Sequence, residues 1–324
     1  MSDDRITQAV VPALGATVHF VDRDYMRSDR PQGFMRAAQA WPAAKLPIDW
    51  YGDIPFPCYA NFRYGTCGLE MAAHGDQTFT GNHGARSKFD VDRFVAQYFA
   101  ISGGDRGLTE NQVVNGIWKR GIAGDPGAII YDAIDINPDP LTIASAVQNF
   151  GCVCLAISTP NEWIARFDPS GGAIWDAAYP NPRNGHYVLI NGVDDLGRMR
   201  VQTWGSWAWL TPAGLASADP DTFTVFSPRW FDPKTGKDPA GATYEAKAEL
   251  WRRLGGQQVP PAASPEPEPI PEPVKDPTYQ VLKVGEYNVT LWLDGSEPPA
   301  SAGKKPATFQ LGDQKIHLSA NKGK

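Results

Sequence analysis

A cysteine stands at residue 67, where a glycine-containing loop gives way to residues that favour a helix. The stretch is YGTCGLEMA, residues 64–72, and the residues from Cys67 onward space their apolar side chains as a helix would. A thiol in the first turn of a helix feels the positive end of the helix dipole, which favours the nucleophilic thiolate. Cys67 is therefore a candidate nucleophile. The alternative is a small apolar residue that begins a buried helix.

A histidine at residue 186 begins a run that is typical of a β-strand. Residues 186–191 and 198–203 have strand character and flank the turn-rich GVDDLG, which predicts a β-hairpin. If that turn is central, His186 lies opposite Gln202 or Thr203, with Cβ atoms about 5 Å apart. A hydrogen bond from Gln202 would then fix the imidazole, as the third member of a catalytic triad does. The alternative is an ordinary histidine on a surface hairpin.

Several stretches between residues 45 and 215, taken in order, resemble the papain family of cysteine peptidases. They are LPIDWYGDIPFPCYANFRYGTCG, ISGGDRGLTENQVVNGIWKRGI, AVQNFGCVCLAIS, NGHYVLINGVDD and VQTWG. The resemblance implies a thiol-dependent peptide-bond hydrolase that acts on peptide or protein substrates and needs no cofactor. It also implies an α+β, two-lobed papain-like fold, with the cysteine on a helical lobe and the histidine on an antiparallel β lobe.

The resemblance assigns a role to each matching residue. Cys67 matches the nucleophile, and its backbone N–H would form the oxyanion hole together with Asn61. His186 matches the general base, and Gln202, sixteen residues later, takes the place of the orienting Asn. The other matches are Gly103 and Gly104 beside the bound peptide, and Trp204, which would shield the triad hydrogen bond from water.

The chain departs from the family at four matching positions. Asn61 is one methylene shorter than the family's Gln, and Gln202 is one methylene longer than its Asn. Gly68 stands where an aromatic residue usually follows the nucleophile, and Tyr64 stands where a disulfide cysteine is usual. These departures motivate the alternative function, a catalytically weak or inactive papain-like module that serves binding or assembly in a virion or a surface complex.

Two other histidines compete for the role of general base. His74 follows Cys67 by seven residues, which on a helix is about two turns, or roughly 10 Å, and is too far for direct proton transfer. His83 lies in a glycine-rich loop and matches no motif.

The other cysteines are expected to be packing residues. Cys152 and Cys154 lie two apart in an apolar run and would share one face of a strand. Cys58 lies in PFPCYANF and is expected to pack in the same way. Since no second close cysteine pair or histidine cluster accompanies them, no metal site is expected.

The composition shifts along the chain predict four zones. Residues 1–44 read as an irregular extension without the helical pattern of the family's inhibitory propeptide, so no zymogen control of that kind is expected. Within the region that resembles papain, Thr109 and Gln112 have the spacing of a capping box, which predicts that a helix begins there. The zones are the N-terminal extension (1–44), the papain-like catalytic domain (45–258), a Pro/Glu-rich linker (259–277) and a small β-module (278–324).

The composition and net charge of the chain limit the kinds of partner that it is expected to bind. The chain has 324 residues, 42% of them hydrophobic, and a net charge of −6, which describes a globular protein without the basic footprint of a nucleic-acid binder. No apolar run approaches the roughly 18 residues of a membrane span. The start, MSDDRITQAV, lacks the pattern of a signal peptide. A cytoplasmic location is therefore expected, with virion association or non-classical release as alternatives, and the β-module is a candidate site for a protein partner.

Overall fold

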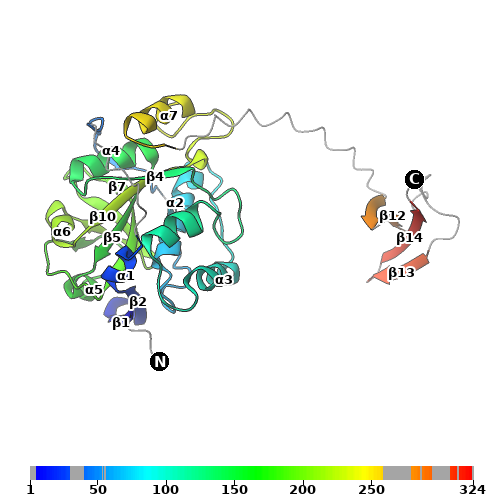
Figure 1. The fold of residues 1–324 in the computed structure, drawn as a ribbon, viewed down its shortest axis with the longest axis horizontal. Helices are drawn as coiled ribbons and strands as arrows, with labels where there is room; N and C mark the ends of the chain where they lie inside the picture. Colours follow the sequence, from blue (N-terminus) through cyan, green and yellow to red (C-terminus); the bar gives the residue numbers. More distant parts are fainter. Residues whose placement is uncertain are drawn as a thin grey trace. The chain divides into compact units, whose positions relative to one another are not determined.

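The computed structural model describes residues 5–29, 40–52, 54 and 56–257, together with four strands near the C-terminus (Figure 1). Its contacts divide the chain into two compact units, Met1–Ala263 and Ser264–Lys324. The predicted linker, residues 259–277, lies outside the described residues, so the boundaries expected on either side of it remain predictions.

The C-terminal unit contains a four-stranded antiparallel sheet, which agrees with the β-module expected from its alternating sequence. The strand order is β11-β12-β14-β13. The strands are β11 (Tyr279–Val284), β12 (Tyr287–Leu293), β13 (Ala307–Leu311) and β14 (Gln314–Lys322).

A ten-stranded sheet runs through the first unit. Seven strands follow the order β4-β10-β5-β7-β8-β9-β6, in which only the pair β6 and β9 is parallel. The strand β7 is buried along its whole length and also pairs with β2 and β3, and β2 pairs with β1. The strands are β1 (Ile6–Val11), β2 (Ala16–Val21), β3 (Ile48–Asp49), β4 (Asp132–Asp135), β5 (Val153–Ser158), β6 (Ala173–Trp175), β7 (Gly185–Val193), β8 (Met199–Thr203), β9 (Ser206–Leu210) and β10 (Asp221–Phe226).

The helix that carries the candidate nucleophile lies with its helical neighbours on one side of this sheet (Figure 1). The helix α2 (Cys67–Gly81) packs along β7, and α3 (Val91–Ser102) and the helical segment η2 (Gln112–Trp118) lie beside it. The predicted capping box is confirmed, because Thr109 and Gln112 exchange two backbone-to-side-chain hydrogen bonds of 3.0 and 3.2 Å. The other helices are α1 (Arg23–Arg27), α4 (Pro140–Phe150), α5 (Asn161–Ala165), α6 (Pro212–Ser217) and α7 (Tyr244–Arg253).

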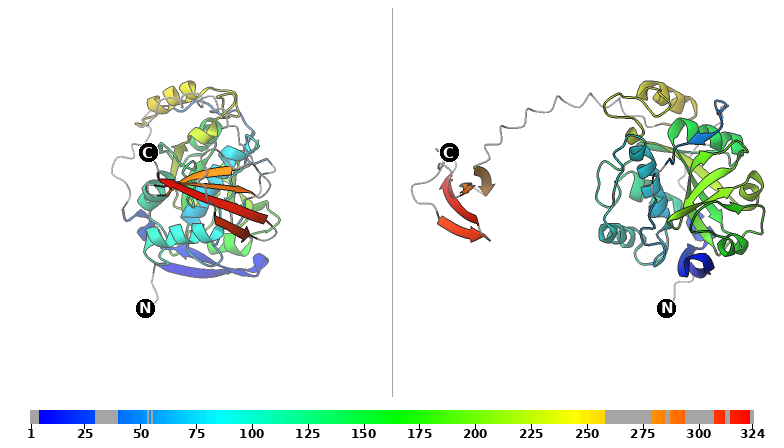
Figure 2. Two further views of the ribbon diagram at one scale, coloured as in Figure 1. Left: turned by 90° about the vertical axis from the view of Figure 1, so that its right-hand side faces the viewer. Right: turned by 180° about the vertical axis from the view of Figure 1, so that it is seen from behind.

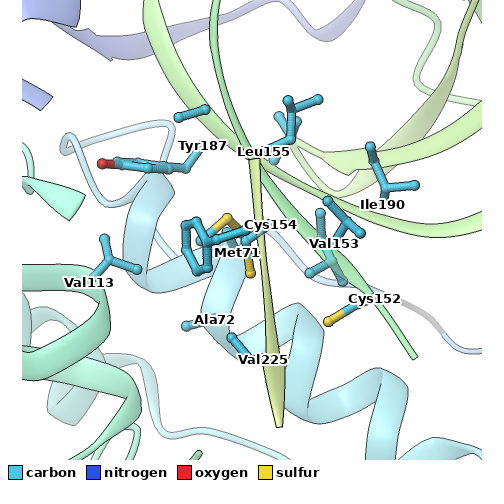
Figure 3. Close-up of a cluster of buried hydrophobic side chains, with 14 of the residues drawn as sticks. Met71, Ala72, Val113, Cys152, Val153, Cys154, Leu155, Tyr187, Ile190 and Val225 are labelled. Carbon is cyan, nitrogen blue, oxygen red and sulfur yellow. The ribbon is translucent and has the colours of Figure 1, made fainter. Parts of the chain in front are cut away.

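The glycine after the candidate nucleophile lets α2 lie directly against its neighbours. A Cβ at Gly68 would lie 2.8 Å from Val113 and 3.2 Å from Tyr187. Figure 3 shows both of these side chains with Met71 in the apolar cluster between α2 and the sheet. The space that an aromatic residue would need at position 68 is thus filled from β7 and η2.

The two cysteines of the run GCVCLAIS are core residues, as predicted. Cys152 and Cys154 are completely buried beside Val153 and Leu155 (Figure 3). All four cysteines of the chain are free thiols. Cys58, also predicted to be a packing residue, is half-buried.

The prediction that the first 44 residues are irregular is wrong for residues 5–28. These residues, called the hairpin segment below, form the strands β1 and β2 and the short helix α1. They turn at Gly15, whose φ of 59° is a left-handed conformation that glycine adopts without strain. Figure 2 shows the hairpin, in blue, lying across one end of the body.

The α+β class is confirmed. A helical layer that begins at Cys67 packs on an antiparallel sheet whose central strand carries His186. The hairpin segment is an integral part of this body, because Val21 of β2 pairs with Gly185 of β7.

Candidate active site

The nucleophile predicted from the sequence begins a helix. Cys67 is the first residue of α2, and its side chain is only 1% exposed. The backbone N–H of Tyr187 donates a hydrogen bond to its sulfur, but burial outweighs this contact and raises the pKa of the Cys67 thiol to about 12. Cys67 is therefore a neutral thiol in this structure, and its sulfur lies next to the residue that follows His186.

The imidazole of His186 is buried between aromatic rings. It stacks on Trp204, the residue predicted to shield the triad, at a centroid distance of 5.0 Å. Its Nε2 lies 2.6 Å from Thr203 Oγ1, and its Nδ1 has no hydrogen-bond partner among the described residues. Because burial lowers the pKa of His186 to about 3, the ring is neutral. The contact with Thr203 leaves Nδ1 as the free nitrogen.

The prediction that Gln202 orients His186 is wrong in this structure. The amide of Gln202 instead donates a 3.1 Å hydrogen bond to Asn191 Oδ1. The cause is a β-bulge between Ile190 and Gly192, which places Leu189 opposite Gln202. One extra residue in a strand moves every following side chain to the opposite face. The bulge therefore turns Gln202 away from His186 and brings Thr203 onto its face.

The residue predicted to complete the oxyanion hole lies just before α2. Asn61 is completely buried, its Nδ2 donates to the Tyr64 carbonyl at 3.3 Å, and its Oδ1 has no partner among the described residues. Its backbone carbonyl accepts the N–H of His19 from the hairpin segment at 3.4 Å. The amide of Asn61 is thus close to the nucleophile in sequence and engaged locally in this structure.

The glycines predicted to lie beside bound peptide have no close neighbour from another element among the nearest atoms around a built Cβ. Gly103 ends α3 and has no neighbour within 4 Å of a built Cβ, and Gly104 faces its own loop at Arg106. Gly107, three residues later, is the glycine that meets a β-strand, because a Cβ there would lie 2.3 Å from Val21. Within this glycine-rich stretch, Gly107 is therefore the glycine that packs against β2.

The end of β2 in the hairpin segment lies between the Gly107 loop and the start of β7. Phe20 is completely buried, with its ring edge-on to His186 at 5.7 Å and to Trp204 at 5.9 Å. Its neighbour Val21 lies between Gly107 and Gly185. The strand β2 thus covers the imidazole of His186, and Cys67 is likewise closed to solvent.

Two arginines of the hairpin segment hold it to the sheet. Arg23 is almost fully buried and donates to Asp221 at 2.5 Å and to the Ala156 carbonyl at 3.0 Å. Arg27 donates to Asp221 at 2.6 Å. It also donates to both carboxylate oxygens of Asp219, at 2.8 and 2.9 Å. Bidentate, partly buried pairs of this kind are stronger than isolated surface ion pairs.

A second group of titratable side chains lies along the first turns of α2. Glu70 is buried, with one oxygen 3.9 Å from the sulfur of Cys58 and the other 3.8 Å from His74 Nε2. Burial raises the pKa of Glu70 to about 8 and lowers the pKa of His74 to about 4. His74 Nε2 lies 3.0 Å from the Pro57 carbonyl, so this histidine does not serve Cys67. His83 likewise contacts a distant carbonyl, that of Trp230.

The buried carboxyl of Glu70 should make the protein less stable at alkaline pH. Its pKa is about 8 in the folded protein, against an ordinary value of 4.5 for an exposed glutamate. Its stabilising effect is therefore present below about pH 4.5 and is lost as pH rises through 8. Glu70→Gln should remove this loss. Between pH 6.5 and 9, the melting temperature of the wild type should fall relative to Glu70→Gln by about 5 °C. The pKa shift of His74 acts at lower pH and does not enter this window.

Differential scanning fluorimetry across that pH range measures the effect. Glu249→Gln, on an exposed helix face, is the matched control and should follow the wild type. Parallel melting curves for Glu70→Gln and the wild type would show that Glu70 is already ionised in the folded protein.

Within the described residues, no group of three or more His, Cys, Asp or Glu side chains could hold a metal ion. No helix in that part of the chain is both long enough and apolar enough to cross a membrane.

Comparison with known proteins gives similarities to solved structures alone. No protein-family model and no curated protein matches the chain. Xylellain, a cysteine protease from Xylella fastidiosa, is 13% identical, with a TM-score of 0.46 over 60% of this chain and 95% of its own. The digestive procathepsin L 3 of Tenebrio molitor is 15% identical, with a TM-score of 0.46 over 63% and 77%. The cysteine protease and lectin-like domains of Cwp84 from Clostridium difficile are 12% identical, with a TM-score of 0.41 over 70% and 62%. At low sequence identity, this chain is similar to papain-like cysteine proteases.

Proposed function

We propose that this protein is a latent cysteine peptidase in which Cys67 is the nucleophile and His186 the general base. The observation that carries the proposal is the placement of Cys67 at the start of α2, with its sulfur on the N–H of the residue that follows His186. A helix N-terminus favours the thiolate, and a neighbouring imidazole can accept its proton. The hairpin segment holds this pair neutral and closed to solvent until it is displaced.

The chemistry follows from which imidazole nitrogen is free. In the tautomer in which Nε2–H donates to Thr203 Oγ1, the unpartnered Nδ1 is the nitrogen that takes the thiol proton of Cys67. The thiolate attacks the carbonyl carbon of an extended peptide, and the backbone N–H of Cys67 and the amide of Asn61 stabilise the oxyanion. His186 then protonates the leaving amine. Water hydrolyses the acyl-enzyme and regenerates the thiol.

Opening the site supplies the charges that this chemistry needs. Burial raises the thiol pKa and lowers the imidazole pKa, so both shifts oppose a thiolate–imidazolium pair. Displacing Phe20 returns water to the ring of His186 and so removes the largest cause of the imidazole shift. An imidazolium beside Cys67 in turn favours the thiolate. The covered structure is therefore a resting state of the proposed enzyme.

Thr203, rather than Gln202, should be the residue that orients the general base. In protein opened by Phe20→Ala, Thr203→Val should lower kcat by about tenfold to 100-fold with little change in KM, because base orientation is disturbed and substrate binding is not. Thr203→Ser keeps the hydroxyl and should retain most of the activity. Steady-state kinetics on a fluorogenic peptide measures both constants.

The matched control for Thr203 is its neighbour. Gln202→Ala should act on stability, since its amide holds the bulged Asn191, and should lower kcat less than Thr203→Val. The reverse order of effects would restore Gln202 as the orienting residue. Cleavage of a peptide library by the Phe20→Ala protein, followed by mass spectrometry of the products, tests the activity itself and defines the substrate.

A further inference from the structure

One carboxylate connects the loop before the nucleophile to the loop of Gly107, which packs against β2. Asp105 lies in the loop that follows α3, and its Oδ1 accepts the backbone N–H of Gly65 at 2.9 Å. The same oxygen accepts the hydroxyl of Tyr98 at 2.7 Å, and that hydroxyl in turn accepts the N–H of Gly107 at 2.9 Å. Gly65 lies two residues before Cys67, and Gly107 is the glycine that meets the covering strand.

The two glycines allow their backbones to come together at this carboxylate. A Cβ at Gly65 would lie 3.2 Å from the Tyr98 hydroxyl and 3.4 Å from Gly107 Cα. Gly107 has a φ of 73°, a left-handed conformation that a residue with a side chain adopts only at a cost. A side chain at Gly65 would push the loop of the nucleophile away from Tyr98 and Gly107, and a side chain at Gly107 would collide with Val21 of β2.

No covalent link performs this task, because all four cysteines are free. We propose that Asp105 is a positioning residue, which with Tyr98 clamps the Cys67 loop to Gly107 and so sets the nucleophile relative to a bound peptide. This inference rests on the proposed peptidase function, since it assigns the geometry of the same site.

The same carboxylate also receives the hairpin segment. His19 Nδ1 lies 3.6 Å from Asp105 Oδ2, the oxygen that the clamp does not use. Although burial opposes it, the nearby imidazole of His19 and the hydrogen bonds from the Gly65 N–H and the Tyr98 hydroxyl keep the pKa of Asp105 below its usual value. One oxygen therefore holds the nucleophile loop, and the other meets the strand that covers it.

The clamp has a direct readout that does not depend on activity. In the otherwise unchanged full-length chain, Asp105→Ala should increase hydrogen exchange of the Gly65 amide at least about 100-fold, since its acceptor is lost. Tyr98→Phe should do the same at the Gly107 amide and leave Gly65 protected by Asp105. Tyr244→Phe removes a tyrosine hydroxyl from α7, remote from Asp105, and should change neither. Unchanged exchange at Gly65 in Asp105→Ala would overturn the proposal.

Kinetics separates positioning from a purely structural role. In protein opened by Phe20→Ala, Asp105→Ala should lower kcat about 100-fold, the cost of a nucleophile misplaced by about 1 Å, with KM within about threefold. Asp105→Asn keeps an oxygen acceptor for Gly65 and should recover about tenfold of the loss. Equal kcat in the Phe20→Ala and the Phe20→Ala, Asp105→Ala proteins would overturn the positioning role alone. If the Phe20→Ala protein itself neither hydrolyses peptides nor reacts at Cys67, the proposed function fails, and the exchange measurement still decides whether the clamp exists.

Discussion

Phe20→Ala should raise the rate at which iodoacetamide modifies Cys67 by at least about 100-fold. Phe20 is completely buried and lies edge-on to both His186 and Trp204. Truncating a buried phenylalanine typically costs about 3–5 kcal/mol. Phe20→Ala removes packing energy that keeps the hairpin segment closed. Since about 1.4 kcal/mol is a tenfold change in an equilibrium, even a part of this loss should strongly raise the population of the open state.

The control must separate opening of the site from general loss of stability. Phe150→Ala removes an equally buried ring, which packs on Phe226 and Trp251 from α4, and should lower the melting temperature by a similar amount. It should not change the rate at Cys67. Labelling sites are assigned by peptide mass spectrometry. Equal rates at Cys67 in the two variants would show that the hairpin segment does not control access to the thiol.

Cys67→Ala, introduced into the Phe20→Ala protein, should abolish peptide hydrolysis, with a loss in kcat of at least about 10⁴-fold. His186→Ala should have a comparable effect, and the double variant should be no worse than either single change, because nucleophile and base act as a unit. Stability should change little, since Cys67→Ala removes a single buried sulfur atom. Turnover is measured with a fluorogenic peptide, and folding by circular dichroism.

Cys152→Ala is the matched control for this loss. It removes another fully buried thiol, from the core beside β5, and should retain activity. Residual hydrolysis in Cys67→Ala at the level of the parent would assign the nucleophile elsewhere. A protein that shows no hydrolysis before Cys67 is changed, although its cleft is open, would instead support the binding-module alternative.

The elements around the nucleophile follow closely from local sequence. Cys67 begins a helix because the glycine-containing loop ends there and the following residues favour helix. The strands that carry His186 and Thr203 follow from two apolar runs around a turn-rich segment. Both patterns are contained within about twenty residues, which is why they could be predicted.

The face of each strand residue was harder to predict. The bulge at Asn191 inserts one residue into β7, and neither its sequence nor its neighbours mark that position. The buried amides of Asn191 and Gln202 satisfy each other, a pairing between residues eleven apart that the sequence pattern does not show. An unbulged hairpin would have kept Gln202 on the face of His186.

The hairpin segment was missed although its signal was present. ITQAVV and ATVHFV are short β-prone runs separated by PALG, with glycine at the turn. What local sequence could not supply is the long-range pairing of Val21 with Gly185, or the contact of Arg23 with Asp221 almost two hundred residues away. Such contacts are set by the assembled fold, and they convert an apparent extension into the cover of the site.

The pH dependence of Cys67 alkylation in the Phe20→Ala protein, with and without His186→Ala, tests the proposed pair most directly. Once the site is open, Cys67 should be a thiolate paired with imidazolium, so it should react fast down to about pH 6, with an apparent pKa well below about 8.5. Adding His186→Ala should move the apparent pKa of Cys67 alkylation to a single step near or above about 8.5. A single step at or above 8.5 in both proteins would contradict the proposed pair, because Cys67 would then be an ordinary thiol that His186 does not activate.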